Sequence, residues 1–390
     1  MNLSVPISKC LFTENEIQSV IEPLRSGWVV QGPKVLEFEE SWSAFVGVEH
    51  SIAVSSGTAA LHLALAAAGI GPGDEVIVPA FTWVSTANVV ENLGARVVFC
   101  DVNLEDFNLS IAHLKTLVTS KTRAVIPVHL FGAAAQMEEV IEFAQASELS
   151  VVEDAACGFG TRVSEQHVGG LGDIGCFSFH PRKAITTGEG GMMTTSDLKL
   201  ARKLRELRNH GMSQDAPEPH LVGQPYFMAD HNVAGYNYRL TDIQAALGVA
   251  QMSRAEDIVS ERRRLAQRYI HHLQGLPGLV VPGTQPNTTH AFQSFVCRLS
   301  DSSLDLDGLT SRRNRLMSAL KEVGIMSRPG THAVHTLAYY AQKYSLNPAD
   351  LPGALVAHQT SFALPLFVGM TDDEQDYVVA QLTRLVQSPA

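Results

Sequence analysis

The stretch EVIVPAFTWVSTANVVENLGARVVFC, residues 75–100, sets the fold class of this chain. It begins with a β-branched run at Glu75–Pro79, continues with a helical pattern over Val84–Leu93 and ends with a second β-branched run at Ala95–Cys100. Short apolar strands separated by a helix of this length are typical of parallel strands joined by a crossover connection. The stretch therefore predicts one unit of a parallel sheet.

The same alternation continues on both sides of this unit, which indicates an α/β sheet flanked by helices. Between Ile174 and Thr195 the pattern changes to two short strands, GCFSFH and GGMMTT, without a helix between them. Further strands are predicted at Arg123–Val128 and Leu149–Glu153, and helices at Thr58–Ala68, Gln136–Ser147 and Leu198–Asn209.

The second half of the chain predicts a change of domain. Residues 1–254 are expected to form a large domain with a mostly parallel sheet, and residues 255–390 a smaller α+β domain on which about 25 N-terminal residues pack. Gly211–Ala234 is expected to be a long loop. The remaining predicted elements are helices at Leu240–Arg264, Leu309–Val323 and Asp372–Val386, and a strand at Ser294–Leu299.

The composition excludes several classes of protein. Hydrophobic residues make up 45% and charged residues 18% of the 390 residues, which is enough for a large core. The net charge of -11 argues against electrostatic binding of nucleic acid. The five cysteines have no CxxC spacing, so a disulfide framework or a metal site is not expected. With no signal peptide and no membrane-spanning run, the sequence predicts a cytoplasmic protein that does not bind membranes.

Two residues of the predicted sheet are candidates for catalysis. Asp154 directly follows the strand Leu149–Glu153, so its carboxylate is expected at the carboxyl edge, where open α/β sheets bind ligands. Lys183 lies between Pro and Gly-rich turns in SFHPRKAITTGEGG, residues 178–191. A lysine that such turns hold in a fixed position is suited to covalent chemistry with an aldehyde. The alternatives are a helix cap or turn acid for Asp154 and an ordinary surface lysine for Lys183.

Residues 55–62, SSGTAALH, predict an anion site at the start of a helix. The N–H groups near Gly57 and the hydroxyl of Thr58 are expected to form a phosphate cup, although a simple helix cap would have a similar sequence. Trp83 offers an aromatic surface. An anion site, a stacking ring, a strand-end carboxylate and a lysine are together what pyridoxal 5′-phosphate requires. Their combination predicts this cofactor.

Eight runs of residues carry a family resemblance over nearly the whole chain: SGWVVQGPKVLEFEESWSAFVG, SSGTAALHLAL, PAFTWVSTANVV, FCDVNLEDFNLS, IPVHLFG, VVEDAACGFG, GCFSFHPRKAITTGEGGMMTT and AGYNYRLTDIQAALG. They resemble the nucleotide-sugar aminotransferase family (DegT/StrS type) of the fold-type I pyridoxal-phosphate enzymes. The SFHP-x-K-x-x-TTGEGG and GYNYR runs are highly specific for that family.

The resemblance implies roles around the cofactor ring. Lys183 would bond the cofactor and move a proton during the reaction, Asp154 would pair with the pyridinium nitrogen, and Trp83 would stack on the ring. The family often has Gln or His where this chain has Cys157, so the expected contact with the phenolic oxygen is in doubt there. A dehydratase branch of the family has His in place of the lysine, and the presence of Lys183 therefore favours transamination.

The resemblance also implies how the phosphate is held. Gly57, Thr58 and Ser178 would bind it from within one chain. Asn237 would reach it from a neighbouring subunit, which predicts a homodimer with shared active sites. The alternative for Asn237 is a turn residue before the next helix.

Substrate contacts are predicted from the residues themselves. Arg328 offers a planar fork for a carboxylate or phosphate, and His332 and His335 offer partners for sugar hydroxyls. The alternative is that both histidines are satisfied within a packed loop. Arg239 is expected either to bind a substrate anion or to brace the dimer. His129 is expected to be structural.

These expectations combine into one predicted reaction. Glutamate or glutamine would convert pyridoxal 5′-phosphate to pyridoxamine 5′-phosphate, and a keto-sugar carried on a nucleoside diphosphate would then receive the nitrogen in a ping-pong reaction. The alternatives are a pyridoxal-phosphate-dependent keto-deoxysugar dehydratase and an aminotransferase that acts on a keto-cyclitol.

Overall fold

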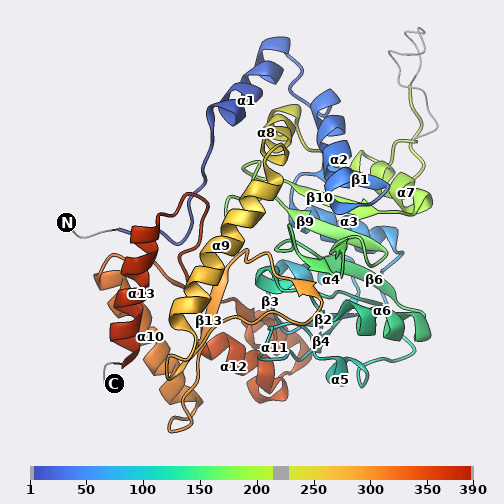
Figure 1. Cartoon of the computed structure of the whole chain (residues 1–390). Coiled ribbons are helices and arrows are strands. Elements are labelled where there is room, and N and C mark those ends of the chain that lie inside the picture. The colour runs from blue at the N-terminus through green and yellow to red at the C-terminus, as the bar shows by residue number, and fades with distance from the viewer. Residues whose placement is uncertain (1–3, 214–227, 388–390) are drawn as a thin grey trace.

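A computed structural model of the chain describes residues 4–213 and 228–387. A seven-stranded sheet lies at its centre (Figure 1). The strand β10 runs antiparallel to both of its neighbours, whereas every other adjacent pair is parallel. The predicted, mostly parallel sheet is thus confirmed. Its strands are, in spatial order, β1 (His50–Val54), β10 (Gly191–Thr195), β9 (Ile174–Ser178), β6 (Ser150–Asp154), β5 (Thr122–Val125), β2 (Glu75–Pro79) and β4 (Arg96–Cys100).

Both faces of the sheet are buried, as parallel sheets require. Successive side chains of a strand point to opposite faces, so Val76 and Val78 lie in one hydrophobic core while Ile77 lies in another. The first core is covered by α3 (Gly57–Ala67), α4 (Ser85–Asn92) and α7 (Leu198–Arg208), and the second by α6 (Met137–Ala146). The near-continuous apolar runs of these strands follow from this burial on both sides.

The C-terminal part has its own antiparallel sheet and its own core. Its strand order is β11 (Leu279–Val280), β13 (Phe295–Leu299), β16 (Ser361–Leu364) and β14 (Arg328–Pro329). The helices α10 (Leu306–Glu322) and α13 (Asp372–Gln387) pack beside this sheet (Figure 1).

The N-terminal segment contacts both parts of the molecule. Val5 pairs with Ile325 and is buried in the C-terminal core. The helix α1 (Glu14–Ser26) instead packs on α8 (Asp242–Met252). The division at residue 254 stays a prediction.

The predicted helix Leu240–Arg264 is wrong, because the structure has two helices there. The first, α8, ends at Met252, and α9 (Ala255–Leu273) begins after Arg254, whose φ of -126° and ψ of 25° are not helical. The apolar pattern continues across this break, so the sequence shows no interruption. Of the expected loop Gly211–Ala234, residues 214–227 lie outside the described residues.

Several elements were not predicted, chiefly at the N-terminus. The helix α1 begins with a capping box in which Thr13 and Glu16 satisfy each other's backbone groups. Among the others are α2 (Pro33–Val46), α5 (Ile111–Leu114), α11 (Ala338–Tyr344), α12 (Pro352–Thr360), β1 and β16.

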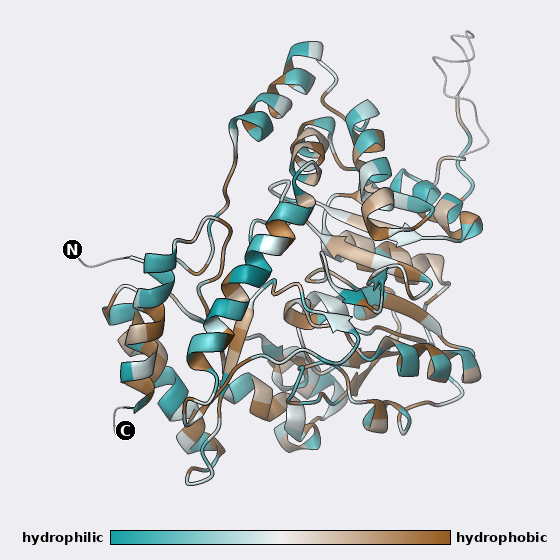
Figure 2. Cartoon of the chain, viewed as in Figure 1, coloured by the Kyte–Doolittle hydropathy of each residue, from teal (hydrophilic) through white to brown (hydrophobic). Residues whose placement is uncertain are grey.

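The hydropathy of the residues matches the burial of the elements that contain them. In Figure 2 the strands of the central sheet are mainly brown or pale, whereas α9 and α13 alternate between teal and brown, as helices with one exposed face do. Among the helices of the described ranges, none combines the length and apolar character needed to span a bilayer.

Candidate active site

The predicted cofactor residues follow strands that run in the same direction, so they share one edge of the sheet. Gly57 follows β1, Asp154 ends β6 and Ser178 ends β9. Trp83 follows β2 through the short strand β3 (Phe81–Thr82). The carboxyl edge of an open α/β sheet is where such folds bind their ligands.

Asp154 is a buried carboxylate with specific donors. Only 5% of the residue is exposed. Its Oδ2 accepts a hydrogen bond from the hydroxyl of Thr86 at 2.8 Å, and its Oδ1 accepts one from the N–H of Ala156 at 3.2 Å. These bonds fix the carboxylate in one orientation at the sheet edge. Thr86 was not predicted as a site residue, because a threonine inside a helix carries no distinguishing signal in the sequence.

The structure brings Lys183 to the strand end that carries Asp154. Lys183 lies in the turn between β9 and β10, where its N–H donates to the carbonyl of His180 at 2.8 Å. Its Nζ donates to the Sγ of Cys157 at 3.1 Å, and Cys157 lies three residues after Asp154. The amine is therefore held at the carboxyl end of β6.

The start of α3 lies against the end of β9. A Cβ atom on Gly57 would be only 2.7 Å from the Cβ of Ser178, so no larger residue fits there without a shift. Ser56 caps the helix by accepting from the N–H of Ala59, and the neighbouring Thr58 is exposed. The close approach leaves an open helix N-terminus beside a serine, an arrangement that can bind a phosphate.

Trp83 and His332 lie together, although 249 positions separate them. The indole ring is 5.7 Å from the imidazole, and Trp83 is 53% exposed, so one side of it is free to stack. The pairing of β3 with β15 (His332–Ala333) places His332 opposite Thr82 and fixes this neighbourhood. Burial lowers the pKa of His332, with His358 as a second cause.

The other two residues of the predicted substrate segment differ in accessibility. Arg328 is exposed on β14. His335 is fully buried, its Nε2–H donates to the carbonyl of Pro348 at 3.0 Å, and burial lowers its pKa. His335 is therefore packed in the interior, as the packing alternative expects, but only one of its ring nitrogens is satisfied, because the buried Nδ1 has no hydrogen-bond partner within the described ranges.

Asn237 and Arg239 are held at the end of α7. Asn237 forms a β-bridge with Asn209, and the guanidinium of Arg239 donates to the side-chain oxygen of Asn209 at 2.7 Å. Within the described ranges no contact joins either residue to Lys183 or Asp154 of the same chain. A role for Asn237 at a neighbouring subunit therefore stays a prediction.

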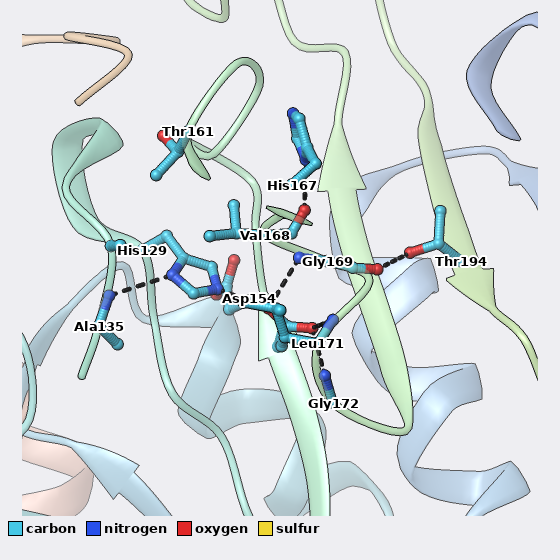
Figure 3. A network of polar contacts seen from close by, with 12 residues as sticks. His129, Ala135, Asp154, Thr161, His167, Val168, Gly169, Leu171, Gly172 and Thr194 are labelled. Atoms are coloured by element: carbon cyan, nitrogen blue, oxygen red, sulfur yellow. Dashed lines mark hydrogen bonds and ion pairs between the residues drawn. The ribbon is translucent and has the colours of Figure 1, made fainter. Parts of the chain in front are cut away.

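A fully buried pair of hydrogen-bonded side chains, Glu153 and His129, lies next to Asp154. The carboxylate of Glu153 accepts from the Nε2–H of His129 at 2.9 Å. The Nδ1 of His129 accepts from the N–H of Ala135 at 3.2 Å (Figure 3). Glu153 and His129 are both 0% exposed. His129 is structural, as predicted, whereas Glu153 was overlooked. The sequence does contain a signal for Glu153, because it is an acidic residue inside an apolar strand and next to Asp154.

Glu153 also holds the turn that leads into β9. It accepts from the backbone N–H groups of Gly169, Leu171 and Gly172 at 2.7–2.8 Å (Figure 3). Burial alone would raise the pKa of Glu153, but the bonds from His129 and these amides outweigh it, so the pKa lies below its usual range. The carboxylate thus ties β6 to the segments on both sides of it.

Glu153→Gln should lower the free energy of unfolding by about 3 kcal/mol, because it removes the charge from four hydrogen bonds and turns an amide toward backbone donors. The lowered pKa of Glu153 gives the wild type stability that is present above the ordinary carboxyl pKa and is lost as pH falls through the lowered value. Denaturant unfolding at several pH values measures both effects.

The control for this variant is Glu40→Gln, on the exposed side of α2, which should change stability by less than about 0.5 kcal/mol. Equal stability of the two variants would contradict the role assigned to Glu153.

Comparisons with known proteins point to one family. The family model for the DegT/DnrJ/EryC1/StrS aminotransferases matches residues 11–383. The chain is 38% identical over 387 residues to the spore coat polysaccharide biosynthesis protein SpsC of Bacillus subtilis (strain 168), covering 99% of this chain and 98% of that protein. It is 38% identical over 374 residues to the GDP-perosamine synthase of Caulobacter vibrioides, covering 95% of each.

A solved structure shares the whole fold. The putative sugar aminotransferase Spr1654 from Streptococcus pneumoniae, in its PMP form, superposes with a TM-score of 0.91 at 27% sequence identity. The superposition covers 98% of this chain and 99% of that one.

Proposed function

The chain belongs to the DegT/DnrJ/EryC1/StrS aminotransferase family and is a pyridoxal-phosphate-dependent sugar aminotransferase; on this premise we propose that it carries an amino group from glutamate or glutamine to a ketohexose linked to a nucleoside diphosphate. The observation that carries the proposal is the contact of Lys183 with Cys157 at the strand end that holds Asp154. The bound cofactor supplies an aldehyde that takes up nitrogen and a ring that withdraws electrons from the reacting carbon.

Lys183 is proposed as the residue that bonds the cofactor and moves the proton. Its Nζ would take a proton from the α-carbon of the amino donor and return one to the sugar carbon that receives nitrogen. The turn that carries Lys183 is tied at both ends to strands of the central sheet, which limits the volume that its amine explores. Donor and acceptor would use this one amine in turn, which accounts for ping-pong kinetics.

Asp154 is proposed to hold a proton on the ring nitrogen of the cofactor. Burial strengthens the attraction between its carboxylate and a cationic ring, and Thr86 keeps one carboxylate oxygen oriented. Trp83 would cover one face of the ring. The N-terminus of α3, with Gly57, Thr58 and Ser178, would bind the phosphate end.

The sugar side of the site is proposed near His332. The exposed Trp83, the neighbouring His332 and Arg328 on β14 are open to a ligand, and an arginine can bind a diphosphate by two parallel hydrogen bonds. The name of the Caulobacter relative, GDP-perosamine synthase, supports a nucleotide-linked substrate.

We propose further that two copies of the chain form a homodimer in which Asn237 of each completes the phosphate site of the other. Large apolar side chains between the end of α1 and the start of α2 support an interface. Leu24, Trp28, Val30 and Leu36 are each exposed by 48–62%, an accumulation that is unusual on a free surface.

The reaction is tested by single turnovers of enzyme loaded with pyridoxamine phosphate. We expect a nucleotide-linked ketohexose to recover the absorbance of the lysine-bound cofactor, and L-glutamate or L-glutamine to reverse it. A panel that also contains keto-inositols and free ketohexoses separates the sugar proposal from the cyclitol alternative. Loss of a sugar hydroxyl without amino transfer would instead identify a dehydratase and overturn the proposal.

A further inference from the structure

Arg262, on α9, is a buried cation without a carboxylate partner. It is 5% exposed, and burial lowers its pKa to about 10. Its Nε donates to the carbonyl of Phe292 at 3.2 Å, and its Nη2 donates to the carbonyls of Gln293 and Leu366. Among the described residues, no Asp or Glu lies within salt-bridge distance of it, and its Nη1 has no hydrogen-bond partner.

Arg262 and Lys183 line the same small cavity. Its volume is about 30 Å³, and its wall includes Arg262, Lys183, Arg254 and Cys10. No acidic residue lines it. Of the cations in this wall, Arg254 is already neutralised by Glu16, at 2.7 Å. The cavity is therefore electropositive, and Lys183 forms part of its wall.

The size of the cavity restricts what can enter. A water molecule needs about 10–15 Å³ of such volume, so the cavity has room for about two waters or for one planar carboxylate. It is too small for a sugar ring or a nucleoside. An unpaired buried charge costs several kcal/mol, a cost that an incoming anion with matching geometry offsets.

We propose that Arg262 and this cavity bind one carboxylate of the amino donor, and so place the amino group of that donor beside Lys183. The inference rests on the proposed transfer from an amino acid and adds the site that recognises it. The guanidinium keeps its three bonds to backbone carbonyls and offers Nη1 to the carboxylate. The keto-sugar has no carboxylate and would not use this site.

The test uses glutarate, a dicarboxylate without an amino group, as a probe that binds and does not react. Its dissociation constant for the cofactor-loaded enzyme is measured by titration calorimetry. Arg262→Gln should weaken glutarate binding by about 10- to 100-fold. In steady-state assays the KM for the amino donor should rise by a similar factor, while the KM for the keto-sugar stays within about threefold.

Arg313→Gln is the matched control. Arg313 is also buried, at 7% exposure, and it also donates to backbone carbonyls, those of His358 and Ser361, but it does not line the cavity. It should leave glutarate affinity within about threefold of the wild type. Equal losses in both arginine variants would overturn the site, because general loosening would then explain them.

If Arg262→Gln fails to fold, a second variant tests the same cavity. Cys10→Leu adds a larger side chain to the wall of the cavity and leaves the bonds of Arg262 intact, so it should exclude glutarate to a similar extent. Unchanged glutarate affinity in Cys10→Leu, together with normal amino transfer, would overturn the carboxylate site alone. Arg262-dependent glutarate binding in an enzyme that accepts no amino acid would support the site and overturn the proposed function.

Discussion

Lys183→Ala should abolish amino transfer, with a fall in turnover of at least about 10³-fold. Proton transfer by a positioned side chain accounts for about 10²–10⁴-fold of rate, and the same amine also holds the cofactor covalently. The Nζ is held at the end of β6 through Cys157, whereas the neighbouring Arg182 is exposed to solvent. Rapid-quench measurement of each half of the reaction determines the size of the loss.

Arg182→Ala is the control for this variant, because it changes a cationic residue in the same turn and should retain most activity. A second measurement does not depend on turnover. Borohydride converts the bond between a lysine amine and an aldehyde into a stable adduct, which mass spectrometry should locate at Lys183. An adduct on another lysine, or full activity in Lys183→Ala, would refute the assignment.

Asp154→Asn should reduce amino transfer by about 150- to 5,000-fold. Removal of one partner of a buried ion pair costs about 3–5 kcal/mol, and each 1.36 kcal/mol corresponds to a factor of ten in rate. The asparagine keeps the shape of the side chain and can still bond Thr86. The loss therefore measures the negative charge, and the kcat of both half-reactions should fall together.

Two comparisons isolate that charge. Thr86→Val removes only the hydroxyl that donates to Asp154 and should cost about 10-fold or less. A cofactor analogue that is methylated on its ring nitrogen carries a permanent positive charge, so it should restore much of the activity of Asp154→Asn. If the variant is as active as the wild type with the natural cofactor, Asp154 does not serve the ring nitrogen.

Much of the fold could be predicted because its signals are local. The strand at Glu75–Pro79 has the predicted bounds, and the other predicted strands of the central sheet, such as Ser150–Asp154, differ by a few residues at their ends. Strands that are buried on both faces must be apolar throughout, and this pattern is read directly from the sequence. The break at Ser253–Arg254 could not be read, because an apolar periodicity continues through it.

The sequence by itself determined the class of the molecule and the chemical kinds of its proposed site residues. Each of these features is a pattern of only a few consecutive residues, and over such short distances the backbone conformation depends mainly on local residues. The features are a lysine between Pro and Gly-rich turns, an acid at a strand end and small residues at a helix start. The same motifs carried the family resemblance, since they are the parts of the chain that a shared cofactor constrains.

Only the tertiary structure decided which side chains meet. It packs His332 beside Trp83, buries His335 against the carbonyl of Pro348 and leaves Arg262 without an acid beside the cavity of Lys183. Such contacts join positions that are tens to hundreds of residues apart, and they follow from how the helices and the two sheets pack. Burial and the choice of hydrogen-bond partner are properties of that packing, so no local pattern in the sequence can specify them.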